Sequence, residues 1–178
     1  MLVVVAIFIS AGIYMIFSRQ GEEQTRQEIQ LETHMLNIDY LYERIIELHP
    51  GNRYPVSIED VVFFYGLTYE FIYGPLVPDD GTLIEVLELQ RLLYHDDLLR
   101  LNSLEIQFIG IREALGELYM QGVHCTGFYI GTPVIDGNTA TVRCVIHLAN
   151  VSDMTKDIHL VLNPQNNRWQ IVMWENVR

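Results

Sequence analysis

The sequence predicts an α+β fold, with three helices packed on a curved four-stranded antiparallel sheet, preceded by an N-terminal transmembrane helix and a helical juxtamembrane stalk. Two observations predict the folded domain. Up to Gly122 the apolar residues recur with a period of about 3.6, which is typical of helices, and after Gly122 the period changes to about 2, which is typical of strands. A sheet with one apolar face needs a cover, and the helices have apolar faces that can supply it.

The first 18 residues are expected to form an uncleaved membrane anchor, in contact with the lipid bilayer through Leu2–Phe17, which carries no charge. A helix over this run spans about 24 Å, close to the ~30 Å of a hydrocarbon core. The alternatives are a buried helix and a signal peptide, although no basic segment precedes the run and no small-residue cleavage site ends it. Because Arg19 and Arg26 follow the run, we expect the natural start to lie upstream and to carry Lys or Arg.

Residues 19–50 are expected to form a juxtamembrane helix, and residues 51–178 the folded domain. The second half of this helix carries an apolar stripe at 4-3-4-3 spacing: Leu31, Met35, Ile38, Tyr42 and Ile45. The stripe favours a helix that rests on its own domain, and the alternative is a homodimer contact through the stalk. The segment His49–Pro55 contains Pro and Gly, which end the helix.

Three helices follow within the domain. Ser57 and Asp60 resemble a capping box at the start of the first, whose apolar face runs from Ile58 to Ile72. Turn residues predict a loop over 74–81. The second helix is expected from residue 82 or 83 to about residue 101. The third has its apolar residues at helical spacing and ends at Gly122: Leu104, Phe108, Ile111, Leu115 and Leu118.

Four antiparallel strands are expected after Gly122. On the strand from Thr139, even-numbered residues from Ala140 to Leu148 form the apolar face. A two-residue turn would place Phe128 and Ile130 of the preceding strand on the opposite face, so we expect a three-residue loop over 136–138 that pairs Ile135 with Thr139. The third strand is marked by Ile158, Leu160 and Leu162, and the fourth by Trp169, Ile171 and Met173.

The charge balance of the chain argues against some classes of partner. The formal net charge is −12, from 23 acidic and 11 basic residues, and Lys156 is the only lysine. This balance argues against nucleic-acid binding and against electrostatic docking on anionic lipid. His147 and His159 have the same parity on neighbouring strands and could approach each other near Asp157, but a metal site needs three or four converging ligands, so we expect no metal and no cofactor.

The cysteines and the acidic pairs are expected to be structural. Cys144 lies on the apolar face and Cys125 has the opposite parity on its strand, so we expect two free thiols. The cluster His95-Asp96-Asp97 is expected to be a solvated helix end, because adjacent carboxylates on a helix point about 100° apart.

The candidate ligand-binding residues are Tyr65, Tyr69 and His124. Tyrosine and phenylalanine surround most of the first helix of the domain, and this pattern fits either core packing or a pocket in which tyrosine hydroxyls orient a guest. His124 would be a polar group at the mouth of the apolar sheet face. We expect no catalytic residue.

Two stretches resemble known families. The residues from Gly137 to Glu175 resemble the closing sheet of nuclear-transport-factor-two-like (cystatin-like) domains, which end with an apolar strand, a polar turn and a W-x-I strand, here Leu160–Leu162 and Trp169–Ile171. "YPVSIEDVVFFYGLTYEFIYG" and "LLYHDDLLRLN" are similar to an uncharacterised clostridial family of small single-pass membrane-anchored proteins. The chain departs from that family at Val56–Ile58, where Thr-Pro-Arg is typical, and in having so little lysine.

The resemblance implies a bacterial single-pass protein in the cell membrane, with its domain on the extracytoplasmic side and no catalytic residue. We therefore expect a non-catalytic module that binds an unknown protein or a small apolar ligand, and not an enzyme. One alternative is a structural subunit of a membrane-spanning secretion or conjugation assembly. Another is a pocket hydrolase or isomerase that uses His124 or a buried tyrosine as its acid–base group.

Overall fold

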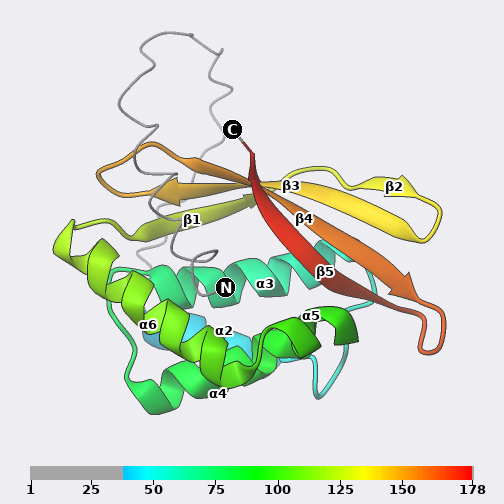
Figure 1. The fold of residues 1–178 in the computed structure, drawn as a ribbon, viewed down its shortest axis with the longest axis horizontal. Helices are drawn as coiled ribbons and strands as arrows, with labels where there is room; N and C mark the ends of the chain where they lie inside the picture. Colours follow the sequence, from blue (N-terminus) through cyan, green and yellow to red (C-terminus); the bar gives the residue numbers. More distant parts are fainter. Residues whose placement is uncertain (1–37, 178) are drawn as a thin grey trace, which may run out of the picture.

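The computed structural model describes residues 38–177, which form an α+β fold with all helices on one side of an antiparallel sheet (Figure 1). The predicted anchor over 1–18 and the stalk up to residue 37 lie outside the described residues. Within 38–177, no helix combines the length and the apolar character needed to cross a bilayer. The helices are α2 (Ile38–Leu48), α3 (Ile58–Tyr73), α4 (Asp80–Arg91), α5 (Asp96–Leu101) and α6 (Leu104–Met120). The strands are β1 (Cys125–Ile130), β2 (Val134–Asp136), β3 (Thr139–Leu148), β4 (Met154–Asn163) and β5 (Arg168–Val177).

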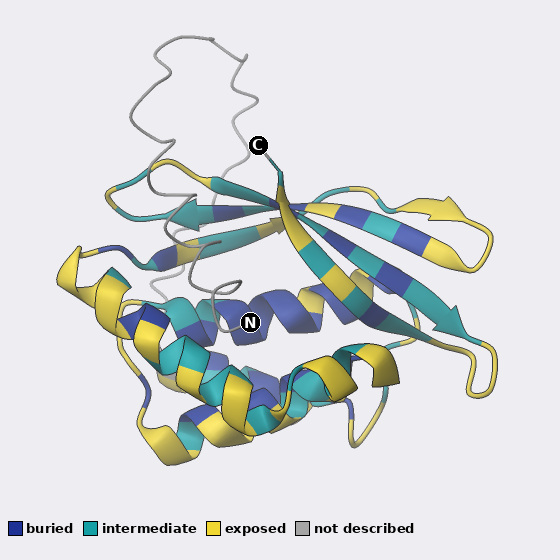
Figure 2. Ribbon diagram, viewed as in Figure 1, coloured by how far each residue is buried: buried dark blue, intermediate teal, exposed yellow. Residues whose placement is uncertain are grey.

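Helix α3 is the centre of the molecule, and most of its residues are buried between the sheet and the other helices (Figure 2). The predicted cap is confirmed, because the Ser57 hydroxyl accepts a hydrogen bond from the Asp60 N–H at 3.0 Å. Helix α2 packs on α3: Ile45 is fully buried, and the Tyr42 ring lies 5.9 Å from that of Phe71. The described part of the apolar stripe therefore rests on its own domain.

The single helix predicted over 82–101 is wrong, because the chain leaves the helix after Arg91 and forms the separate helix α5 from Asp96. Between them, the Leu93 carbonyl accepts a hydrogen bond from the Ile171 N–H at 2.8 Å, and the His95 N–H donates to the Ile171 carbonyl at 2.9 Å. The His95 N–H has one hydrogen to donate, so it cannot also bond to the Arg91 carbonyl four residues back, and the helix does not continue through this segment. The third predicted helix is confirmed as α6.

The sheet has the order β1-β3-β4-β5, with β2 also paired to β3. Strand β1 has the predicted register, with Ile130 opposite Cys144. The three-residue loop is wrong, because Asp136 pairs with Thr139 across a two-residue turn. The chain takes up the extra residue between β1 and β2, where the Gly131 N–H donates to the Arg143 carbonyl at 2.8 Å. A Cβ on Gly131 would lie 2.6 Å from that carbonyl oxygen, so glycine suits this bulge.

The inner face of the sheet forms the core with α3. The even-numbered residues from Ala140 to Ile146 of β3 are buried, as predicted, together with Ile158 and Leu160 of β4. A buried polar network joins the helices beneath: the Gln90 amide donates to the Thr68 hydroxyl at 2.7 Å and accepts from the Tyr94 hydroxyl at 2.7 Å. Because each polar group in this network has a partner, it can hold α3, α4 and residues 92–95 together inside the core.

Candidate functional site: an aromatic cluster around Lys156

Tyr65, Tyr69 and Tyr73 lie four residues apart on α3, so they share one face of the helix, and that face meets the sheet. The centroid of the Tyr69 ring lies 6.3 Å from that of Tyr65 and 4.5 Å from that of Tyr73. Phe128 of β1 lies 6.2 Å from Tyr65, and Trp174 of β5 lies 6.0 Å from Tyr65. We call these five residues the aromatic cluster.

Close approach of α3 to the sheet depends on Gly66. A Cβ at this position would lie 2.6 Å from the Cδ1 atom of Phe128, well inside van der Waals contact. The absence of a side chain at Gly66 therefore lets the Phe128 ring lie against the helix backbone. This contact places Phe128 within 6.0 Å of the Tyr69 ring centroid.

Lys156 of β4 points into the same region. Its side chain is only 7% exposed, and its ammonium lies 5.0 Å from the centroid of the Tyr69 ring. Its cross-strand partners are Cys144 on β3 and Asn176 on β5. Among residues 38–177, no ion pair includes Lys156. Burial lowers the pKa of this lysine from 10.5 to about 8, so most copies carry the charge at neutral pH.

The tyrosine hydroxyls of the cluster remain protonated across the physiological range. Burial raises the pKa of Tyr73 to about 12, and the pKa values of Tyr65 and Tyr69 lie well above their usual 10.0. A protonated phenol can donate one hydrogen bond and accept others. The cluster therefore offers apolar ring surface, hydroxyl groups and one cation.

The two cysteines are both free and both buried. The free thiols were predicted, but their placement on opposite faces is wrong. A register shift between Cys125 and Gly127 turns Cys125 into the core, beside the aromatic cluster. Burial raises the pKa of each thiol to about 12, which leaves almost no nucleophilic thiolate at neutral pH.

The structure brings Tyr65 and Tyr69 together but places His124 elsewhere. His124 precedes β1 and is partly exposed, and its main-chain carbonyl accepts a hydrogen bond from the Ala149 N–H at 2.9 Å. It lies four residues before Phe128, about 13 Å along an extended chain. His124 takes no part in the ring contacts of the aromatic cluster.

The predicted approach of His147 to His159 is wrong. His147 lies 2.8 Å from the Asp153 carboxylate, whereas His159 pairs across the sheet with Thr141 and lies 3.2 Å from the Glu175 carboxylate. Thr141 and His147 are six residues apart on β3, about 20 Å in a strand. No group of three or more potential metal ligands occurs within residues 38–177.

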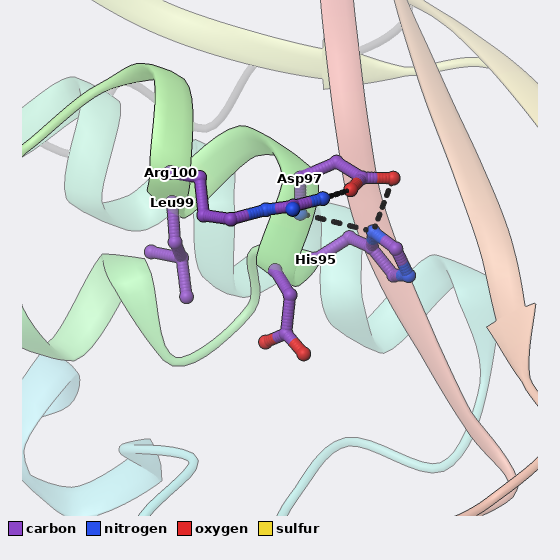
Figure 3. Close-up of a pocket in the computed structure, with 5 residues that line it drawn as sticks. His95, Asp97, Leu99 and Arg100 are labelled. Carbon is purple, nitrogen blue, oxygen red and sulfur yellow. Dashed lines mark hydrogen bonds and ion pairs between the residues drawn. The ribbon is translucent and has the colours of Figure 1, made fainter.

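A shallow hollow on the surface lies at the start of α5, remote from the aromatic cluster in sequence (Figure 3). Three of its polar residues are engaged with one another: the His95 ring accepts a hydrogen bond from the Asp97 N–H, and Asp97 pairs with Arg100. These are contacts of a helix N-cap and of a pair one turn apart, in agreement with the expected solvated helix end.

Lys156 is the residue that the sequence reasoning missed. It shares the parity of Ile158 and Leu160, the residues used to define the inner face of that strand, so the same alternation would have placed it inside.

Comparison of this chain with protein-family models, with curated proteins and with solved structures found no match.

Proposed function

We propose that this protein is a non-catalytic binding module, held by a single N-terminal anchor on the extracytoplasmic side of a bacterial membrane, and that it takes up a small apolar ligand. The observation that carries the proposal is the aromatic cluster, where rings from α3, β1 and β5 converge on the inner face of the sheet. Sites for small apolar ligands combine aromatic walls with a few polar groups, and the tyrosine hydroxyls and Lys156 are such groups.

The enzyme alternative has less support from the same residues. A hydrolase or isomerase of this kind needs a pair of groups, a nucleophile or base and an acid, whose pKa values lie near the working pH. Lys156 has a pKa in that range, about 8, but it forms no ion pair with an acidic group among residues 38–177. Burial moves the pKa values of Cys125 and Cys144 away from neutrality, to about 12. His124 immediately precedes β1 and takes no part in the ring contacts that form the aromatic cluster.

The proposal is tested by photolabelling the full chain in nanodiscs with an uncharged probe, a dodecanol that carries a diazirine on its chain. We expect the label on peptides of α3 that contain Tyr65 and Tyr69. Tyr69→Leu should reduce this labelling by about three- to tenfold, because an aromatic contact contributes about 0.5–1.5 kcal/mol beyond its buried area.

Tyr129→Leu is the matched control, since Tyr129 belongs to β1 but is 50% exposed. It should leave labelling of α3 unchanged. Label confined to exposed residues of the outer sheet face, or spread evenly over the surface, would contradict the proposal. Circular dichroism of each variant checks that the fold is retained.

A further inference from the structure

The surroundings of Lys156 differ from those of the chain's paired arginines. Arg44, Arg100, Arg112 and Arg143 each form an ion pair with a carboxylate. The chain contains 23 acidic residues, yet none within 38–177 pairs with Lys156. Lys156 is nevertheless buried, with an exposed fraction of only 7%. A buried charge is normally paired, because removal from water is costly.

The residues that contact Lys156 or lie opposite it on the neighbouring strands carry no charge. Its ammonium lies over the Tyr69 ring of α3, and its partners across the strands are Cys144 on β3 and the exposed Asn176 on β5. The cation–π contact with Tyr69 offsets only part of the cost of burying an unpaired ion. Among residues 38–177, the site therefore has one positive charge beside aromatic rings and no anion that pairs with it.

A ligand complementary to this site has one negative charge and an apolar tail. We infer that the ligand is a single-chain carboxylate, whose head group pairs with the Lys156 ammonium while its alkyl chain lies along the aromatic cluster. This inference rests on the proposed function and adds the class of ligand. An ammonium accepts a carboxylate as a point charge, without the bidentate geometry that an arginine would impose.

The experiment compares three photoreactive probes of the same chain length, with a carboxylate, a hydroxyl or an amine as head group. The full chain is placed in nanodiscs of phosphatidylcholine, a zwitterionic lipid without net charge. The carboxylate probe should label α3 at about ten- to a hundredfold lower concentration than the alcohol, since a hydrogen bond to a charged group contributes about 1.5–3 kcal/mol. The amine probe should label least, because the ammonium of Lys156 repels it.

Lys156→Met should remove the preference for the carboxylate, so that the carboxylate and alcohol probes label α3 at similar concentrations. Arg100→Met is the matched control, because Arg100 is an exposed cation paired within its own helix, and the preference should survive. Competition by unlabelled carboxylates distinguishes a ligand with an alkyl chain from a short free carboxylate. Unlabelled dodecanoate should displace the carboxylate probe, whereas acetate at the same concentration should not.

Failure of the inference and failure of the proposed function give different results. If the alcohol and the carboxylate label α3 equally in both the wild type and Lys156→Met, the head-group assignment is wrong and the apolar site remains. If no probe labels α3, the binding module itself is wrong. If acetate competes as well as dodecanoate, the site binds the carboxylate without using the chain, which also overturns the inference.

Discussion

At the scale of single residues, the inward position of Lys156 carries a cost that its neighbours only partly offset. Burial holds its folded-state pKa near 8, below the 10.5 of an exposed lysine. The unfolded chain therefore binds this proton more tightly than the folded chain does. The free energy of unfolding is lowered by this group below about pH 8, and the loss is recovered as the pH rises towards 10.5.

We expect Lys156→Met to be more stable than the wild type by about 2–3 kcal/mol at pH 7, with roughly half of this difference remaining at pH 9.5. The neighbouring thiols and phenols titrate in both proteins. The difference in the free energy of unfolding between the wild type and the variant therefore reports on the lysine alone. Urea unfolding followed by tryptophan fluorescence at the two pH values measures it. A gap that is the same at pH 7 and pH 9.5 would show that the lysine charge is not the cause.

At the same scale, the alternation of inward and outward residues along a strand predicted burial correctly for β3 and wrongly for Cys125 of β1. The inward set of β3, with Val142, Cys144 and Ile146, was predicted and is buried. Cys125 was assigned to the wrong face, because alternation assumes a continuous strand and a register shift interrupts β1. Tyr65 and Tyr69 were correctly placed on one helix face, but whether they bind a ligand stays a proposal.

At the scale of the elements, the contact between α3 and β1 determines where the aromatic cluster forms. Gly66 allows the approach, and the Phe128 ring occupies the space that a side chain would need. Gly116 of α6 is also helical, but a Cβ there would meet nothing within 4 Å. The two glycines therefore form a natural pair for comparison.

Gly66→Ala should destabilise the protein by about 1–3 kcal/mol, because the added methyl group forces the Phe128 ring to move in a packed core. Gly116→Ala should instead stabilise it by about 0.5–1 kcal/mol, since alanine loses less backbone entropy in a helix. Thermal unfolding of both variants, followed by circular dichroism, measures the two shifts. Equal shifts in one direction would contradict the close approach at Gly66.

At the scale of the whole molecule, the helices cover one face of the sheet and leave the outer face without a helical cover (Figure 1). On that outer face, the guanidinium of Arg143 donates to both oxygens of Asp157, at 2.9 and 2.8 Å.

The proposed location of the folded part outside the cell can be tested with a cysteine-reactive reagent, because both native thiols are fully buried. A single introduced cysteine would thus be the only reactive one among residues 38–177.

Leu101→Cys places a thiol at the end of α5, where the native side chain is 79% exposed. We expect a membrane-impermeant maleimide to label this variant in intact cells and to leave the wild type unlabelled. Mass shift on a gel measures the modification. Labelling of Leu101→Cys only after the cells are lysed would place the domain on the cytoplasmic side and contradict the proposed orientation.

By itself, the sequence determined the α+β class, the starts of α3 and α6, and the inward residues of β3 and β4. These follow from local backbone geometry, since the periods of 3.6 and 2 and the capping of Ser57 depend on neighbouring residues alone. The tertiary structure decided the break between α4 and α5 and the bulge at Gly131, because each depends on hydrogen bonds to another segment of the chain. It also decided that Lys156 has no ion-pair partner among residues 38–177, because every element packed around a side chain determines whether such a partner is present.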